Sequence, residues 1–410
     1  MDPNEAARRL TEISDEKRPR DEQGYVAYIE ELLKGAGIPT GIIAPDPSRP
    51  CLYAKITKSS DSKSSGSKSS EGLSPLLLYG KASLTQPEGG PVGIRVGAAL
   101  FVTTMLKIKA LRKRLPFDLL LLITCSSPGE SGLGYVAEKY PKLFTGVKYA
   151  LNDTGGFPVV LGQKKLHPIT VAERQAARFR VTARGKMGLA RIVQGALKLE
   201  KKSLSVRITE PVRRMANDFG RALGETDEIM FRFMQRPFFT RKVVSFIGAN
   251  KQFFEPLLAN EAKVVGIHGL NEANPGEMPD SAFIEIEARI LPDVSIKEGM
   301  ADIRRVIGPG YEIEVLAGSD TPPVDMALYD SMAEVLKSRS PGALPVPFVS
   351  KDMTDARFLT KLGIQSYGFA PIDCLGSYSF FEIPRAGGQA SADALSSGAQ
   401  TLLDFLLSLR

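Results

Sequence analysis

The chain has 410 residues, of which 43% are hydrophobic and 24% are charged, and its formal net charge is +7. These values are ordinary for globular proteins, and no apolar run approaches the roughly 18 residues that a membrane-spanning helix needs, so the sequence argues against a disordered chain and against a membrane protein. Lysine and arginine are spread along the chain without interleaved aromatic residues, which favours a solvated basic surface over one that binds nucleic acid.

The N-terminus and the cysteines indicate the compartment, and the length indicates the number of domains. The first 23 residues mix acidic and basic side chains and lack the apolar core of a signal peptide. Three cysteines, Cys51, Cys125 and Cys374, lie far apart without the spacing of a metal site, and an odd count fits a reducing environment. We expect a cytoplasmic protein with roughly two or three domains.

The first half of the chain predicts strands that alternate with helices. A helix is expected from 22 to 34, because its apolar residues recur on one face and glycines follow. The strands "CLYAKIT" and "PLLLY" flank a segment rich in Ser and Lys, which predicts a flexible loop. A helix from about 98 to 111, the strand "DLLLLIT" and a helix from 132 to 139 follow. This order predicts an α/β fold, with a mostly parallel sheet flanked by helices on both faces.

The pattern changes near residue 178. The stretch "RFRVTAR" alternates apolar and polar residues, as a half-exposed strand does, and "AFIEIEARIL" repeats that alternation. Between them, "TEPVRRMANDFGRAL" carries Thr209 as a predicted N-cap and Pro211 in the first turn of a helix. We expect residues 179–292 to form an α+β domain inserted into an α/β domain of residues 1–178 and 293–410, which closes with an amphipathic helix.

Polar side chains follow two strands of the predicted sheet. The stretch "LLLYGKASLTQP" places Lys81 and Ser83 at the end of one apolar strand, and Ser126 and Ser127 follow another. Ligands of such sheets bind beyond the carboxyl ends of the strands. The sequence therefore places a candidate site at this edge.

Six segments in a fixed order resemble a known family: "PLLLYGKAS", "ALNDTGGF", "VTARGKMG", "MPDSAFIEIEARILP", "MTDARFL" and "YGFAP". Together they resemble the di-zinc exopeptidases and deacylases related to carboxypeptidase S, acetylornithine deacetylase and succinyl-diaminopimelate desuccinylase (peptidase family M20). The resemblance covers nearly the whole chain. It implies a zinc-bearing α/β domain and an inserted lid domain that usually forms a dimer contact.

The same resemblance implies that the metal site is degenerate. In the family pattern Gly-His-x-Asp, Lys81 stands where a ligand histidine belongs and Ser83 where the aspartate that orients it belongs. The bridging aspartate aligns with Val96, and the family's Asp-Glu-Glu run aligns with Ser126, Ser127 and Pro128. The last ligand histidine aligns with Pro384, and the lid's transition-state histidine aligns with Leu189. Of the family's ligand positions, only the one at Asp153 keeps an acidic side chain. The chain's two histidines, His167 and His268, lie in no zinc motif, and we expect neither zinc nor another cofactor.

Residues that the family uses for substrate handling are better kept. Arg289 matches a lid arginine that resembles a carboxylate clamp, and a guanidinium suits a planar carboxylate. Thr354, Asp355 and Arg357 match a loop beside the family's active site. The alternatives are an exposed strand arginine and ordinary loop capping. The lid asparagine of the family aligns at about Gly276.

Three functions remain open at this point. The first is a pseudoenzyme that binds an amino-acid-like or peptide-like ligand, as a homodimer or together with a related subunit. The second is a metal-independent enzyme in which Lys81 activates Ser127, as in Ser-Lys hydrolases, with Cys125 a weaker nucleophile. The third is residual zinc-dependent hydrolysis. The candidate catalytic residues are Lys81, Ser127 and Asp153, and the candidate substrate-binding residues are Arg289, Thr354, Asp355 and Arg357.

Two structural predictions follow from the resemblance. In the family, the residues that match Lys81 and Asp153 bind the same zinc ion, so we predict an ion pair in which the Lys81 ammonium replaces the metal, within about 4 Å of the carboxylate. The strand "RFRVTAR" and the helix at Pro211 are predicted to form the dimer contact, because the strand would otherwise present an open edge.

Overall fold

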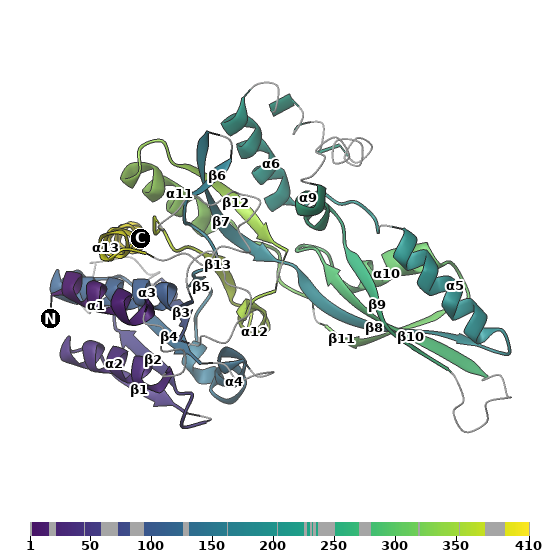
Figure 1. The fold of residues 1–410 in the computed structure, drawn as a ribbon, viewed down its shortest axis with the longest axis horizontal. Helices are drawn as coiled ribbons and strands as arrows, with labels where there is room; N and C mark the ends of the chain where they lie inside the picture. Colours follow the sequence, from purple (N-terminus) through teal and green to yellow (C-terminus); the bar gives the residue numbers. More distant parts are fainter. Residues whose placement is uncertain are drawn as a thin grey trace, which may run out of the picture. The chain divides into compact units, whose positions relative to one another are not determined.

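The computed structural model describes residues 2–15, 22–44, 46–58, 73–82, 94–125, 131–161, 163–202, 204–224, 228–229, 232, 235–236, 251–269, 280–318, 320–351, 353–373 and 390–409. The chain divides into two compact units, and Figure 1 shows their elements. Unit 1 comprises Met1–Val171, Asp325–Phe348 and Phe358–Arg410, and unit 2 comprises Ala172–Val324 and Val349–Arg357. The sequence-based domain limits at 179 and 292 both fall inside unit 2.

Unit 1 is built on a mixed sheet whose central strands run parallel. Among the described residues the strand order is β1-β2-β4-β3-β5-β13-β7-β12, and β6 pairs with β7. The bounds are β1 Thr40–Ile43, β2 Cys51–Ile56, β3 Leu76–Lys81, β4 Leu119–Thr124, β5 Tyr149–Asn152, β6 Val159–Leu161, β7 Lys164–Glu173, β12 Leu344–Ser350 and β13 Gln365–Gly368. β3 pairs in parallel with β4 and β5, and β13 with β5. All six residues of β4 are buried, as expected for a strand that is covered on both faces.

Helices cover this sheet. They are α1 Pro3–Asp15, α2 Glu22–Gly35, α3 Ile94–Ala110, α4 Gly132–Lys139, the 3-10 turn η1 Pro141–Phe144, α11 Ala327–Arg339, α12 Ala356–Thr360 and α13 Ala392–Ser408. α3 contacts β3 and packs against α1 and α13. Leu133 and Val136 of α4 join a second apolar cluster with Leu77 and Leu120 of the sheet. The predicted helix at 22–34 and the predicted strands of this unit are therefore present, and α3 begins earlier than predicted.

Unit 2 contains an antiparallel sheet with the order β11-β8-β10-β9. Its strands are β8 Gln175–Arg184, β9 Glu261–His268, β10 Ser281–Ile290 and β11 Glu312–Ala317, and its helices are α5 Gly188–Lys201, α6 Glu210–Leu223, α9 Lys251–Leu258 and α10 Ile296–Ile307. The alternation predicted for β8 and β10 is present, because every second residue of each strand lies on the buried face. The apolar residues Phe179 of β8 and Ile284 of β10, for example, are fully buried. They pack with α5 and α10 in one core.

The prediction that "RFRVTAR" presents an open edge is wrong. This stretch lies in β8, which pairs with β10 on one side and β11 on the other. The edges of the described sheet are β9 and β11. Residues 312–317, which lie beyond the predicted limit at 292, supply the strand that closes β8.

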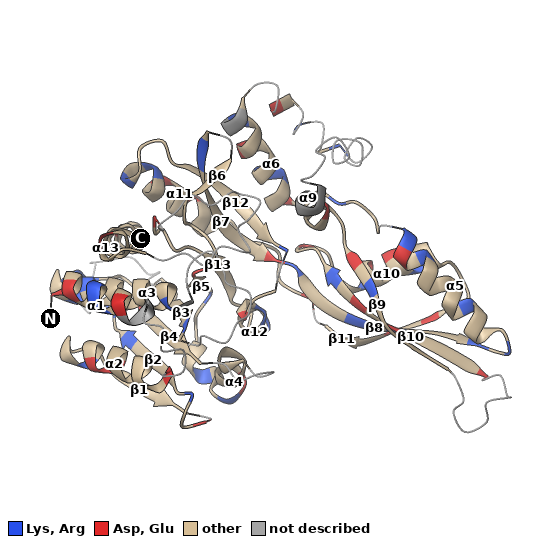
Figure 2. Cartoon of the chain, viewed as in Figure 1, with Lys and Arg blue, Asp and Glu red and all other residues tan. Residues whose placement is uncertain are grey.

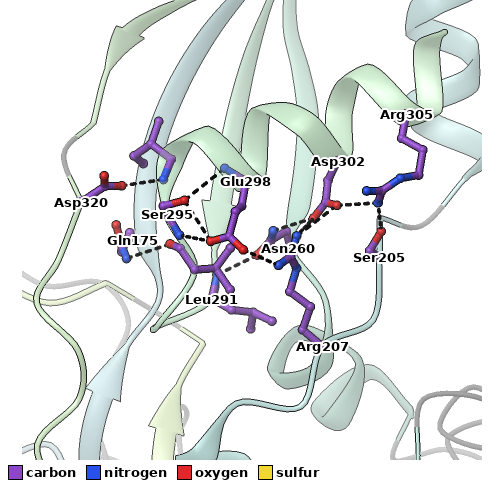
Figure 3. A network of polar contacts seen from close by, with 12 residues as sticks. Gln175, Ser205, Arg207, Asn260, Leu291, Ser295, Glu298, Asp302, Arg305 and Asp320 are labelled. Carbon is purple, nitrogen blue, oxygen red and sulfur yellow. Dashed lines mark hydrogen bonds and ion pairs between the residues drawn. The ribbon is translucent and has the colours of Figure 1, made fainter.

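A buried acidic residue anchors α10 in unit 2 (Figure 3). The side chain of Asp302 has no exposed surface, and it accepts hydrogen bonds from Asn260 at 3.0 Å, Arg207 at 3.3 Å and Arg305 at 2.8 Å. Asn260 also accepts the amide of Leu291 at 2.8 Å. The network joins α10 to the start of β9 and to the segment before α6. It is a structural network, because every charge in it faces an opposite charge or an amide.

Charges of both signs occur on both units. Figure 2 shows lysine, arginine and acidic residues together on α1, on α5 and on the sheet of unit 2. On that sheet Arg180 pairs with Glu285 at 3.1 Å and Arg184 with Glu312 at 2.9 Å. In the part of the chain that the structure describes, no helix is both long enough and apolar enough to cross a membrane.

Candidate functional site

The carboxyl ends of β3 and β5 bring Lys81 and Asp153 to the same edge of the unit 1 sheet. Lys81 is the last residue of β3, and Asp153 directly follows β5, its parallel neighbour. Both residues are half-buried. The Asp153 side chain lies against Gly97 in the first turns of α3, where a Cβ atom would overlap the carboxylate. Glycine at this position lets the helix approach the acidic side chain.

The charge of Lys81 acts on Asp153. Loss of solvent raises the pKa of the Asp153 carboxyl to about 6, and the positive charge of Lys81 opposes that rise. The two groups are therefore close enough to interact electrostatically. The ion pair at hydrogen-bond distance stays a prediction.

Asn152 orders the turn that carries Asp153, and the sequence reasoning did not identify it. Its buried amide donates to the Tyr79 hydroxyl at 2.6 Å, and its carbonyl oxygen accepts from the amide and hydroxyl of Thr154 at 3.0 and 2.6 Å. An asparagine that bonds the backbone two residues later forms an Asx turn. The "ND" pair after an apolar strand is the signal that could have indicated it.

Two of the described residues that the resemblance aligns with the family's metal ligands, Lys81 and Val96, offer no donor to a zinc ion, whereas Asp153 does. Zinc needs several N, S or O donors with free lone pairs. The Lys81 ammonium offers none, and Val96 is a buried aliphatic residue of α3. Leu189, which aligns with the family's lid histidine and not with a metal ligand, packs against the unit 2 core. Within the described ranges, no group of three or more His, Cys, Asp or Glu side chains could hold a metal ion. Ser83, Ser126, Ser127, Pro128, Gly276 and Pro384 lie outside those ranges.

Cys125 and His167 do not have the properties of reactive groups. Cys125 is buried just after β4, and desolvation, reinforced by the nearby Glu22, strongly raises the pKa of its thiol. A thiol that stays protonated is a poor nucleophile. His167 is buried in β7, and burial lowers its pKa to about 4. It is therefore a neutral strand histidine at physiological pH. The weaker candidate nucleophile of the metal-independent hypothesis thus loses support.

In unit 2, the predicted ligand-binding residues surround a glutamate that the sequence did not indicate. Glu173, the last residue of β7, accepts hydrogen bonds from the amide of Thr354 at 2.8 Å and from its hydroxyl at 2.5 Å. The Thr354 hydroxyl also accepts the amide of Ala356 at 3.1 Å. Loss of solvent raises the pKa of Glu173 to about 7, and the hydrogen bonds from Thr354 only partly oppose it.

The charges of Asp355 and Arg357 act on the same carboxyl group. The negative charge of Asp355 raises the pKa of Glu173 further, and the positive charge of Arg357 lowers it. Asp355 is buried, whereas Arg357 is exposed. Three of the four predicted substrate-binding residues therefore lie near one half-buried acid. Their role in binding a substrate stays a prediction.

The fourth predicted residue, Arg289, reaches the same segment through a carbonyl group. Its guanidinium donates to the carbonyl oxygen of Lys351 at 3.4 Å, and Arg174 donates to that oxygen at 3.1 Å. The amide of Arg174 donates to the carbonyl of Ser350 at 3.2 Å. Arg174 is itself buried and pairs with Glu261 at 3.1 Å. Two guanidinium groups thus converge on one carbonyl, an arrangement that can also serve an anionic group.

Comparisons with known proteins agree on the fold. No family model matches the chain, and no curated protein sequence matches it. Among solved structures, a dinuclear metal-binding peptidase of the M20 family from Bacillus subtilis has a TM-score of 0.56 at 11% identity, covering 98% of each chain. An M20 family metallo-carboxypeptidase from Sulfolobus solfataricus scores 0.53 at 14% identity over 99% of each chain. Human carnosine dipeptidase 1 scores 0.52 at 14% identity, over 98% of this chain and 94% of its own.

Coverage of nearly the whole of both chains means that both units take part in the likeness. The mixed sheet with parallel central strands and the antiparallel second sheet occur in the order expected from the resemblance. The chain therefore has the fold of the M20 family peptidases.

Proposed function

We propose that the chain is a non-hydrolytic relative of the M20 peptidases that binds an amino-acid-like or peptide-like ligand. The observation that carries the proposal is that Lys81 and Asp153 lie at the carboxyl ends of the neighbouring parallel strands β3 and β5, at the two positions where the resemblance to the family implies ligands of a shared zinc ion. Hydrolysis by a metal-bound water needs a cation with an open coordination position. An ammonium group supplies a positive charge and no such position.

The ligand site in this proposal is the cluster in unit 2. Arg289 is half-buried on β10, and its guanidinium can bind the carboxylate of an amino-acid-like ligand through two parallel hydrogen bonds. Asp355 and Arg357 supply charges of both signs nearby. This combination suits a small ligand that carries a carboxylate and an amide or amine. The names of the structural neighbours, which are peptidases, support the same ligand class.

We also propose that the protein assembles through unit 2 as a homodimer or with a related subunit, and that it works in the cytoplasm. The support for assembly is the edge strand β9 and the neighbouring helix α5, which expose large apolar side chains: Val193, Leu197, Val265 and Ile267. An unpaired strand edge with exposed apolar residues favours pairing with another chain. Sedimentation velocity at micromolar concentration tests this, and a monomer without a partner in pull-down experiments would contradict it.

Metal content and ligand binding test the central proposal. Protein purified without chelator, and then incubated with zinc, should contain far less than one zinc ion per chain by elemental analysis. It should leave dipeptides and N-acetyl amino acids intact. Stoichiometric zinc together with turnover would overturn the proposal.

Binding is measured with N-acetyl-L-alanine by calorimetry. Arg289→Met should weaken binding by roughly tenfold or more, since a charge-assisted bidentate pair contributes about 1.5–3 kcal/mol. The matched control is Arg184→Met on the same sheet, where Arg184 pairs with the exposed Glu312. Equal effects of the two substitutions would count against a ligand site at Arg289.

A further inference from the structure

The end of β7 holds the segment of residues 353–357 through Glu173. Both carboxyl oxygens of Glu173 contact Thr354, one through the amide and one through the hydroxyl. Thr354 in turn accepts the amide of Ala356 through its hydroxyl and that of Arg357, at 3.4 Å, through its carbonyl. Through these bonds a single carboxyl group orders the residues that include Asp355 and Arg357.

The charges around Glu173 disfavour its ionised form. Loss of solvent is the largest effect, and Asp355 adds a second negative group, while Arg357 and the Thr354 hydrogen bonds oppose them. Other charged neighbours are already engaged: Arg174 pairs with Glu261 and donates to the Lys351 carbonyl, to which Arg289 also donates. Glu173 is therefore more easily protonated while the segment stays closed over it than it would be in water.

We propose that Glu173 is a positioning residue for this ligand site, which keeps the 353–357 segment closed while it is protonated and releases the segment when it ionises. A protonated carboxyl can still bond Thr354, because it accepts the amide on one oxygen and donates from the other to the hydroxyl. An ionised carboxylate gains hydration when the segment opens. The inference rests on the proposed function for its consequence, since Asp355 and Arg357 would leave the ligand as the segment opens.

The direction of the pH effect follows from linkage. The closed state holds Glu173 with a pKa of about 7, and an exposed glutamate has a lower value. The preference for the closed state is thus complete when the pH is below the pKa of an exposed glutamate. It is lost as the pH rises through the pKa of Glu173 in the closed state. Since each pKa unit is a factor of ten, the ratio of closed to open segment should fall about tenfold from about pH 6 to about pH 8.

Amide hydrogen exchange in the free protein tests the inference without any ligand. After correction for the intrinsic pH dependence of exchange, the protection of Thr354, Ala356 and Arg357 should fall about tenfold over that range and level off above about pH 7. In Glu173→Gln the protection should not change with pH. The matched control, Glu312→Gln in an exposed ion pair of the same unit, should behave as the wild type does. Protection that is independent of pH in the wild type, or a pH dependence that persists in Glu173→Gln, would overturn the inference.

Thr354 provides a second test if Glu173→Gln does not fold. Thr354→Val removes the hydroxyl that lowers the pKa of Glu173. The fall in amide protection with pH should therefore have its midpoint at a higher pH, and Thr354→Ser should restore the wild-type midpoint. A midpoint that Thr354→Val leaves in place would contradict the inference. Binding of N-acetyl-L-alanine is then measured across the same pH range. No binding at any pH would count against the proposed function alone, whereas binding that ignores the observed opening would contradict the role of Glu173 in the ligand site.

Discussion

The two units each contain a carboxyl group whose pKa is raised by loss of solvent, and they compensate for it differently. In unit 1, the positive charge of Lys81 opposes the rise in the pKa of Asp153. In unit 2, two hydrogen bonds from Thr354 and the charge of Arg357 oppose the rise in the pKa of Glu173, whereas the negative charge of Asp355 adds to that rise. A nearby cation stabilises the ionised form, whereas a hydroxyl can serve either protonation state. The comparison contrasts a desolvated carboxyl group that has a cation nearby with one that is held mainly by hydrogen bonds.

The largest effect should come from removing the cation of unit 1. Lys81→Met should lower the free energy of unfolding by about 3 kcal/mol, because it leaves the Asp153 carboxylate desolvated without its counter-charge. Urea denaturation at about pH 9 measures this, because near pH 7 a carboxyl group whose pKa is about 6 can take up a proton at a cost of only about 1.4 kcal/mol. The double variant Lys81→Met/Asp153→Asn should recover most of the loss. Additive effects of the two substitutions would contradict the ion pair.

A methyl group on α3 should disturb the same centre sterically. Gly97→Ala would place its Cβ atom against the Asp153 carboxylate, so the free energy of unfolding should fall by about 2 kcal/mol, as in other overpacked sites. Gly41→Ala is the control, since no atom lies within 4 Å of the added methyl there. If Gly97→Ala were as stable as Gly41→Ala, the close approach of α3 to Asp153 would be wrong.

Neutralising the acid of unit 2 should raise stability, but only at higher pH. Because the folded pKa of Glu173 is raised to about 7, the wild type loses stability as the pH rises from the unfolded value through about 7. Glu173→Gln should therefore be more stable than the wild type by about 3 kcal/mol near pH 8 and by less than about 1 kcal/mol near pH 5. Thermal unfolding at both pH values checks this. A constant difference between them would show that Glu173 does not titrate in this range.

The smallest effect should come from an exposed charge pair of unit 2. Arg184 and Glu312 form a bidentate pair, but both side chains are largely exposed. Arg184→Ala should change the free energy of unfolding by less than about 1 kcal/mol, and the change should vanish in high salt. A larger effect would indicate that burial is not what separates the two carboxyl centres from the surface pairs.

The sequence predicted the elements whose apolar pattern is local. β3 and β4 are continuous apolar runs, and β8 and β10 alternate, so their burial follows from period and composition. The edge of the second sheet was not predictable in this way. β11 lies outside the predicted domain limits, and all but one of its residues are exposed, so its pairing with β8 has no strong local signal.

The site was predictable only where a motif carried it. Thr354, Asp355 and Arg357 came from one contiguous segment, and the structure brings them together around Glu173. Glu173 itself lies 181 positions before Thr354, and nothing in "TVAERQ" indicates a desolvated acid rather than an exposed strand end. Long-range pairing of a single polar residue leaves no periodic trace in the sequence.

The base of the segment between Arg207 and Asn260 has a consequence for protein engineering. Val206 bridges Ala259, the amide of Arg207 donates to the carbonyl of Leu258 at 2.7 Å, and both Arg207 and Asn260 bind Asp302. The two ends of this segment therefore lie side by side next to Asp302. Closing such ends with a short turn costs little chain entropy. A short turn could therefore replace this segment only together with new packing for α6, which buries Val212, Met215 and Phe219.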